Sequence, residues 1–207
     1  ALASGAFVTV NGGTLDLNGQ TVTAGNLAGA GGTLTDNSAT AGTATLTVNQ
    51  AGNSTVSSAI IDGTSKTLAL TKLGNGNLIL GGTQSNTYTG LTTVIGGTLS
   101  LNKSGATAIS GDIQIGDAVG SDVVSLMASD QIADSSVLTF TAGASGNSAF
   151  LRLNGFNETV KGIATSVANA AVIENGTGGQ GTLTVNTAGS DYVYDGIIRN
   201  STGVLAL

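Results

Sequence analysis

Very short alternating stretches constrain the fold of this chain more than any other sequence feature. The pattern is apolar-x-apolar followed by asparagine, and it ends at Asn11, Asn18, Asn49, Asn102, Asn154 and Asn186. Alternation indicates half-buried β-strands, and asparagine tolerates the left-handed backbone that a tight corner requires. Strands this short do not form stable isolated hairpins, so they must stack on neighbours. The pattern therefore predicts a repetitive β architecture with asparagine at its corners.

Stacked coils of roughly 20 residues, each with about three short strands, meet this requirement. The 207 residues would then form an all-β solenoid, a parallel β-helix of about ten coils. Helical patterning is nearly absent. The alanine-rich stretch Gly162–Glu174 lacks an amphipathic stripe, so we expect strand and loop there. The polar stretch Gly111–Asp134 carries five aspartates, and we expect it to bulge from the coils as loops.

The chain also repeats itself at long range. Four short segments recur in order at an offset of 136 or 137 residues: Leu15–Gly19 as Leu151–Gly155, Leu46–Asn49 as Leu183–Asn186, Ile60–Ile61 as Ile197–Ile198, and Leu68–Leu70 as Leu205–Leu207. We therefore interpret residues 1–207 as one continuous β-helix segment. It holds about one and a half copies of a 137-residue module, with 15–70 matching 151–207. The second copy stops where the first continues, so we expect a longer natural chain.

Composition excludes several classes of function. The chain has 12 acidic and 6 basic residues and a formal net charge of −6, and it contains no histidine, cysteine, proline or tryptophan. Scattered lysines and arginines make no nucleic-acid patch. No apolar run is long enough to insert this segment into a membrane. Without histidine or cysteine, the usual acid–base groups and nucleophiles are missing, so we expect no catalysis and no cofactor. The absence of cysteine excludes a cysteine-based zinc site. The spacing of the aspartates fits no known calcium pattern, so we expect no metal site.

One stretch is specific enough to suggest a family. The segments Leu70–Leu80, Asn86–Gly90 and Gly96–Leu99 resemble the autotransporter-associated β-strand repeat, also called the passenger-associated transport repeat. The sequence departs from that pattern at Leu73, Asn77 and Leu91. The residues that match the motif are Lys72, Gly74, Gly76, Asn86, Tyr88, Thr89, Gly90, Gly97, Thr98 and Leu99.

The resemblance implies a right-handed parallel β-helix in an exported bacterial surface protein. Such proteins are often passengers secreted by a C-terminal β-barrel, which this chain does not contain. The resemblance thus predicts an extracellular location at the bacterial cell surface. It covers about 35 residues and names no ligand.

Several residues are candidates for chemistry. Asp191 with Asp195, or members of the group Asp112, Asp117, Asp122, Asp130 and Asp134, could pair as carboxylates or bind calcium, although turn residues of this type are usually solvated. Tyr88, Tyr192 and Tyr194 could stack on sugars, but Tyr88 is expected to pack beneath its own loop. Glycine pairs such as Gly81-Gly82 lack the lysine of a phosphate loop and are interpreted as corners.

Threonine pairs of the form Thr-x-Thr occur at Thr21–Thr23, Thr33–Thr35, Thr45–Thr47, Thr139–Thr141 and Thr182–Thr184. Aligned on one face of a β-helix, they could order water and bind ice. Their irregular intervals argue against an aligned rank.

We therefore predict a structural or adhesive extracellular β-helical segment. Its expected partners are neighbouring β-helix segments or head-to-tail copies of itself, together with glycans of a host or cell surface. A glycan-binding or glycan-degrading β-helix is the first alternative, and an ice-binding solenoid is the second.

Overall fold

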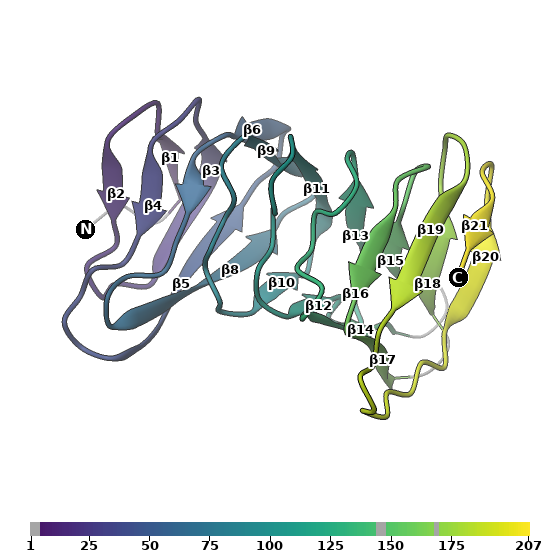
Figure 1. The fold of residues 1–207 in the computed structure, drawn as a ribbon. Coiled ribbons are helices and arrows are strands. Elements are labelled where there is room, and N and C mark those ends of the chain that lie inside the picture. The colour runs from purple at the N-terminus through teal and green to yellow at the C-terminus, as the bar shows by residue number, and fades with distance from the viewer. Residues whose placement is uncertain (1–4, 144–147, 168–169) are drawn as a thin grey trace.

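The computed structural model describes residues 5–143, 148–167 and 170–207, and the regular structure in these ranges is entirely β-strand. The strands wind into coils that stack along one axis from the N-terminus to the C-terminus (Figure 1). Figure 1 shows the chain descending along the front and rising along the rear as it advances, which makes the solenoid right-handed. All strand pairings between successive coils are parallel, so the predicted fold class is confirmed.

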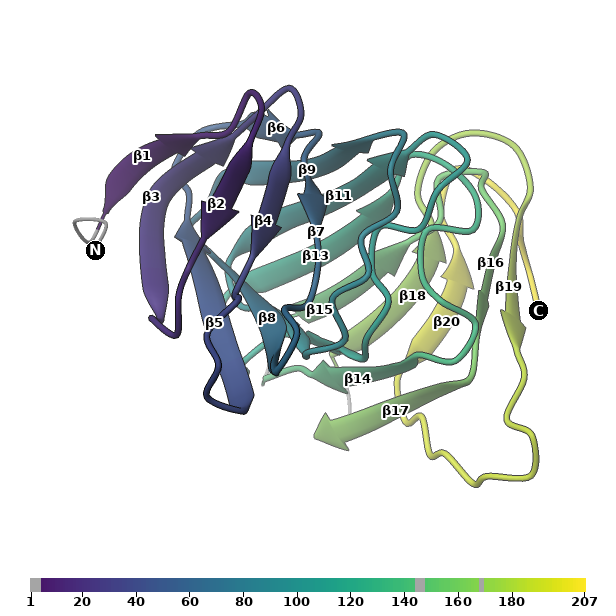
Figure 2. The ribbon, with the colours of Figure 1, turned by 60° about the vertical axis from the view of Figure 1, so that its left-hand side comes forward.

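The stacked coils form three faces, and not every coil has a strand on each of them (Figure 2). The first face is an eight-stranded sheet of β1 (Ala6–Thr9), β3 (Val22–Ala28), β5 (Gly42–Asn49), β8 (Lys66–Leu73), β10 (Thr92–Val94), β12 (Ile113–Ile115), β14 (Val137–Thr141) and β17 (Gly162–Val167). The second face is a seven-stranded sheet of β6 (Ser54–Val56), β9 (Asn77–Gly82), β11 (Gly97–Lys103), β13 (Ser121–Leu126), β15 (Ser148–Arg152), β18 (Ala171–Asn175) and β20 (Ile197–Asn200).

The third face carries two short sheets, one near each end. They are β2 (Thr14–Asp16), β4 (Thr33–Thr35) and β7 (Ala59–Ile60), then β16 (Glu158–Val160), β19 (Gly181–Val185) and β21 (Leu205–Ala206). Between these sheets, in the described part of the chain, the third face is irregular and includes the motif loop at Asn86–Gly90.

The coils are longer and fewer than predicted. From Thr92 to its partner Ile113 the chain advances 21 residues, and from Val124 to its partner Leu151 it advances 27. The eight strands of the first face are thus separated by seven coil-to-coil steps, giving about seven turns instead of ten. The irregular segments at the corners add residues to each coil, and the alternating pattern that marks the strands does not reveal how long these segments are.

The core consists of apolar columns that run along the axis. On the second face the inward column includes Leu78, Leu99, Val124, Leu151 and Ile173, all with 0% exposure and paired in register from coil to coil. Each such side chain contributes about 1.5–3 kcal/mol by leaving water. Because these five successive coils each place an apolar residue in the column, the core is continuous through the middle of the described solenoid.

The prediction that Gly111–Asp134 bulges out as loops is wrong. This stretch supplies β12 to the first face and β13 to the second. The alternating apolar residues Ile113, Ile115, Val124 and Leu126 fill the core, and burial of these side chains outweighs the local turn preference of the aspartates. The predicted strand within Gly162–Glu174 is confirmed as β17 and β18, apart from residues 168–169, which lie outside the described ranges.

The segments that recur in the sequence do not recur at equivalent places in the structure. Leu15 lies on the third face and its match Leu151 on the second, whereas Leu46 lies on the first face and its match Leu183 on the third. An offset of 137 residues thus corresponds to five coils plus two faces. The same pattern serves different faces because each face requires the same apolar–polar alternation.

Candidate functional site

The motif loop Asn86–Gly90 clamps three coils together. The side-chain Oδ1 of Asn86 accepts a hydrogen bond from Ile60 N at 2.9 Å, and its Nδ2 donates to Ala108 O at 2.8 Å. Both the N–H and the hydroxyl of Thr89 donate to Asp62, at 3.0 and 2.7 Å. Buried backbone groups on three successive coils are therefore satisfied by this one loop.

Tyr88 lies inside the solenoid and not on a sugar-stacking surface. Its side chain is fully buried, its hydroxyl lies 2.7 Å from Thr92 Oγ1, and burial raises the pKa of its phenol. The interpretation that it packs beneath its own loop is confirmed.

Lys72 is a buried cation held by carbonyl groups. Its Nζ donates to Leu73 O and Gly74 O at 2.8 Å and to Gly96 O at 2.9 Å. Burial lowers the pKa of Lys72 to about 8, and the nearby carboxylate of Asp122 partly offsets this. The three carbonyl acceptors favour the ammonium form and close the corner between the first and second faces.

The remaining motif residues are needed for the backbone conformation of the corners or for close packing between coils. Gly74 and Gly97 have φ of 74° and 64°. A Cβ on Gly76 would lie 1.9 Å from Gly52 O, and one on Gly90 would lie 2.4 Å from Leu68 O. Thr98 is half-buried in β11 beside the fully buried Leu99. The matched residues thus lie in or beside the coil corners and core.

The six predicted corner asparagines divide into two groups. Asn18 and Asn154 have φ of 48° and 54°, as a left-handed corner requires. Asn11, Asn49, Asn102 and Asn186 have no positive φ and are exposed. No hydrogen bond joins two of these six side chains, all of which lie in the described ranges.

A different set of buried polar residues seals the corners. Gln131 accepts a hydrogen bond from Lys103 N at 2.7 Å and donates to Lys103 O and Ser129 O at 3.0 and 2.9 Å. Glu158 accepts from Gln131 N at 2.9 Å, and burial raises the pKa of Glu158 to about 7. Sequence reasoning missed these two residues because their hydrogen-bond partners lie 28 and 27 residues away in the chain.

The candidate aspartates are spread over the structure and differ in burial. No group of three potential metal ligands occurs among the described residues. Asp112 and Asp117 are exposed and accept hydrogen bonds from Val137 N and Val119 N at 2.8 and 2.9 Å. Asp122 is buried, and burial together with the charge of Asp117 raises the pKa of Asp122 to about 6. Asp130, Asp134, Asp191 and Asp195 are exposed.

The second face carries a charged ladder that sequence reasoning missed. Glu174 bonds Arg152 Nε at 2.9 Å on the preceding coil and Arg199 Nη2 at 2.8 Å on the following coil. Burial raises the pKa of Glu174, but the hydrogen bonds from Arg199 and Arg152 outweigh it, so the net pKa lies below its ordinary value. The partners are 22 and 25 residues away, so only coil register brings them together.

The first face carries an aligned threonine rank. The register pairs Thr23 with Thr47, Thr47 with Thr71, and Thr71 with Thr93, and Thr139 follows after Gln114. The irregular intervals in the sequence do not prevent alignment because the corners absorb the difference in coil length. The other two threonine pairs, Thr33–Thr35 and Thr182–Thr184, lie on the third face.

Tyr192 and Tyr194 both pack onto the solenoid. The Tyr194 ring meets Phe140 edge-on, with centroids 5.4 Å apart, and the Tyr192 ring lies against the backbone of Gly162. Burial raises the pKa of Tyr194. These contacts use ring surface that an exposed sugar platform would need.

No family model, curated protein or solved structure matches this chain. Within the described residues, no helix is both long and apolar enough to cross a membrane.

Proposed function

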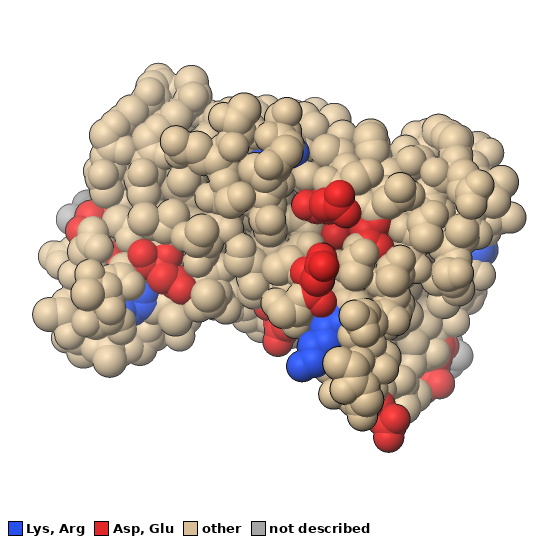
Figure 3. Space-filling model, in the orientation of Figure 1, with Lys and Arg blue, Asp and Glu red and all other residues tan. Residues whose placement is uncertain are grey.

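We propose that this chain is a structural and adhesive segment of an extracellular bacterial protein, with a mechanical role. The observation that supports this most directly is the clamp at Asn86, which joins three coils through two buried hydrogen bonds. Parallel coils with a continuous core resist extension because neighbouring coils are joined by many hydrogen bonds and apolar contacts. Charged side chains cover little of the face seen in Figure 3, as expected of a scaffold more than of a reaction centre.

The two ends of the solenoid suit stacking partners. Near one end a hollow of about 380 Å³ is lined by residues that include Val10, Leu15 and the 83% exposed Phe7. Near the other, Ile198, Leu205 and the 72% exposed Leu207 line a hollow of about 300 Å³. We propose that each end accepts a further β-helix coil, from the same chain or from a second copy, because sheet edges present unpaired backbone groups.

Single-molecule pulling tests the mechanical role. Cysteine handles added at the two ends give unique attachment because the chain contains no cysteine. We expect extension in discrete steps as groups of coils unfold. Asn86→Ala is expected to lower the force of a step, since removing partners from buried backbone groups costs about 1–3 kcal/mol each. Asn102→Ala, at an exposed position, should leave the force unchanged.

Extension at low force without steps, as for a flexible polymer, would overturn the mechanical role. The proposed location is tested separately: antibodies against this segment should label intact cells that make the full-length protein.

The threonine rank favours ice binding as a second candidate function. Its hydroxyl groups repeat at the strand spacing, about 4.8 Å, on a face whose central row is uncharged. Such a row could hold water molecules in a regular array.

Ice recrystallisation inhibition tests this candidate. The parent chain is expected to slow crystal growth, and Thr71→Lys, in the middle of the rank, to abolish the effect. Thr98→Lys is the matched control because Thr98 is half-buried on the second face, away from the rank. A parent chain that leaves crystal growth unchanged would exclude ice binding.

A further inference from the structure

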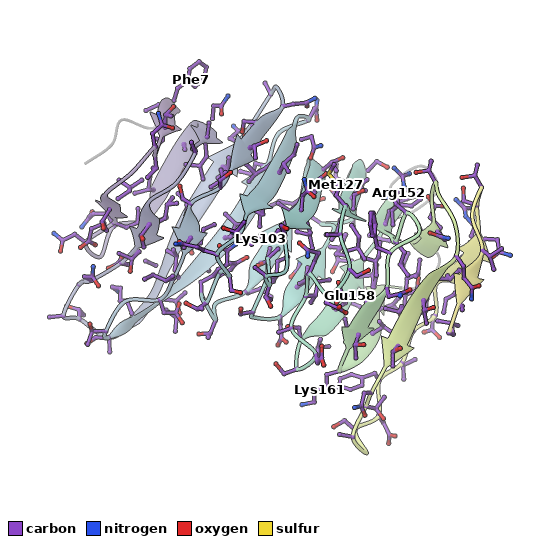
Figure 4. The ribbon with its side chains drawn as sticks, turned by 45° about the horizontal axis from the view of Figure 1, so that its top comes forward. Phe7, Lys103, Met127, Arg152, Glu158 and Lys161 are labelled. Carbon is purple, nitrogen blue, oxygen red and sulfur yellow. The ribbon has the colours of Figure 1, made fainter. Side chains whose placement is uncertain are left out.

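A groove crosses three coils at one edge of the second face. It is lined by Ser125, Leu126, Met127, Asn154, Phe156 and Thr177, and its volume is about 360 Å³. These residues lie at the ends of β13, β15 and β18, which are successive strands, so the groove runs along the solenoid axis for about 10 Å. Figure 4 shows Met127 and Arg152 as neighbours on this side of the molecule.

The lining combines apolar surface with a fixed amide and hydroxyl groups. Met127 is 43% exposed, and Phe156 packs partly buried against the core. The amide of Asn154 is held in place because its Nδ2 donates to Ser125 Oγ at 2.8 Å and Leu126 O at 3.0 Å. Its Oδ1 accepts from Thr177 N at 3.3 Å. A pre-oriented polar rim over an apolar floor is typical of small-ligand sites.

A guanidinium lies in the row next to the groove. Arg152 is the register partner of Ser125, and its Cζ lies 4.8 Å from the centroid of the Phe150 ring. Only its Nε is used in a hydrogen bond within the described ranges, so both Nη atoms are left for a ligand. Glu174 faces both Arg152 and Arg199, so this row carries one net positive charge on a chain whose net charge is −6.

The backbone around the groove is already paired. β13 pairs with β15, and β15 pairs with β18, residue by residue. A peptide therefore cannot add as a further strand here, because strand addition needs a free sheet edge. The groove offers side chains alone, and the ligand must be recognised by them.

We propose that this groove binds an acidic oligosaccharide that contains uronic acid. The uronate carboxylate accepts two hydrogen bonds from the free Nη atoms of Arg152, since a guanidinium matches a carboxylate in shape and charge. The apolar face of a sugar ring rests on Met127 and Phe156. Sugar hydroxyls bond Ser125 and Thr177. The inference rests on the proposed adhesive function and gives it a ligand class, yet it can fail while the mechanical role stands.

Titration of the intact chain with an oligogalacturonate, followed by calorimetry, tests the site. The matched ligand control is the same oligosaccharide with its carboxylates methyl-esterified. We expect binding of the acid and at least about tenfold weaker binding of the ester, because a charge-assisted pair is lost. Arg152→Gln should weaken binding of the acid by a similar factor. Lys161→Gln, a cation outside the groove lining, should not.

Arg152→Gln is expected to fold, because a partly exposed ion pair contributes little to stability and Arg199 still pairs with Glu174. Thermal melting checks this directly. Equal affinity for acid and ester, no binding of either, or unchanged affinity in Arg152→Gln would each overturn the proposal. None of these results would alter the force steps that test the mechanical role.

Discussion

Leu99→Asp is expected to unfold the solenoid. Leu99 has 0% exposure and pairs with Leu78 on one side and Val124 on the other, in the middle of an apolar column. Removing a buried leucine side chain costs about 2–5 kcal/mol, and a carboxylate without a partner costs several more. Together these costs approach the whole stability of a domain, which is about 5–15 kcal/mol. Circular dichroism should show loss of the cooperative thermal transition.

The control is Asn102→Asp on the same strand, since Asn102 is exposed and a carboxylate there stays in water. Removing the exposed Asp117 should likewise change little, because surface substitutions are usually within about 0.5 kcal/mol. If Leu99→Asp melts at the parent temperature, the continuous apolar column does not stabilise this protein.

Stability is expected to fall as pH rises from about 5 to 7, which is opposite to ordinary acid denaturation. Burial raises the pKa of Glu158 from 4.5 to about 7 and that of Asp122 from 3.8 to about 6. The folded chain therefore binds more protons than the unfolded chain in this window, and linkage makes the free energy of unfolding decrease with pH. Each group contributes at most about 3 kcal/mol.

The trend reverses above pH 8. Burial lowers the pKa of Lys72 and of Lys103 from 10.5 to about 8, so the unfolded chain binds more protons between pH 8 and 10.5. Stability then rises with pH, which places its minimum near pH 7–8. Urea unfolding at pH 5, 7.5 and 10 measures the free energy of unfolding before the fall, near the minimum and after the rise.

Glu158→Gln isolates the contribution of Glu158 to the pH dependence of stability. Its amide oxygen can still accept the hydrogen bond from Gln131 N, but the group no longer titrates, so roughly half of the decrease between pH 5 and 7 should disappear. Asp134→Asn is the matched control because Asp134 is exposed. An identical pH profile in parent and Glu158→Gln would show that this carboxyl is not the titrating group.

Much of the fold could be predicted because the alternation of apolar and polar residues over a few positions is enough to indicate a strand. The stretches around Leu78–Leu80 and Leu99–Leu101 show strand pattern in the sequence, and both are strands with buried leucines. The number of coils could not be predicted in the same way. Coil length depends on corner segments, and these vary in length because only their end points are constrained by the stack.

The contacts of the candidate site residues were even harder to predict than the number of coils, because they depend on which residues of neighbouring coils are in register. Arg152 has no charged neighbour in sequence, and Glu174 becomes its partner only because one coil separates them by 22 residues. Buried Gln131 and Glu158 resemble ordinary loop residues in sequence, since their partners lie on other coils. The aspartates of Gly111–Asp134 attracted attention as a polar group, whereas the structure separates the buried Asp122 from exposed turn residues.

The sequence by itself determined that this protein consists of short stacked strands with glycine-rich corners, because alternation and turn preference act within a few residues. Only the tertiary structure decided which coil positions meet: the rank of threonines, the ladder of Arg152, Glu174 and Arg199, and the groove beside it. The physical reason is that parallel register is set by the packing of whole coils, to which every corner between them contributes.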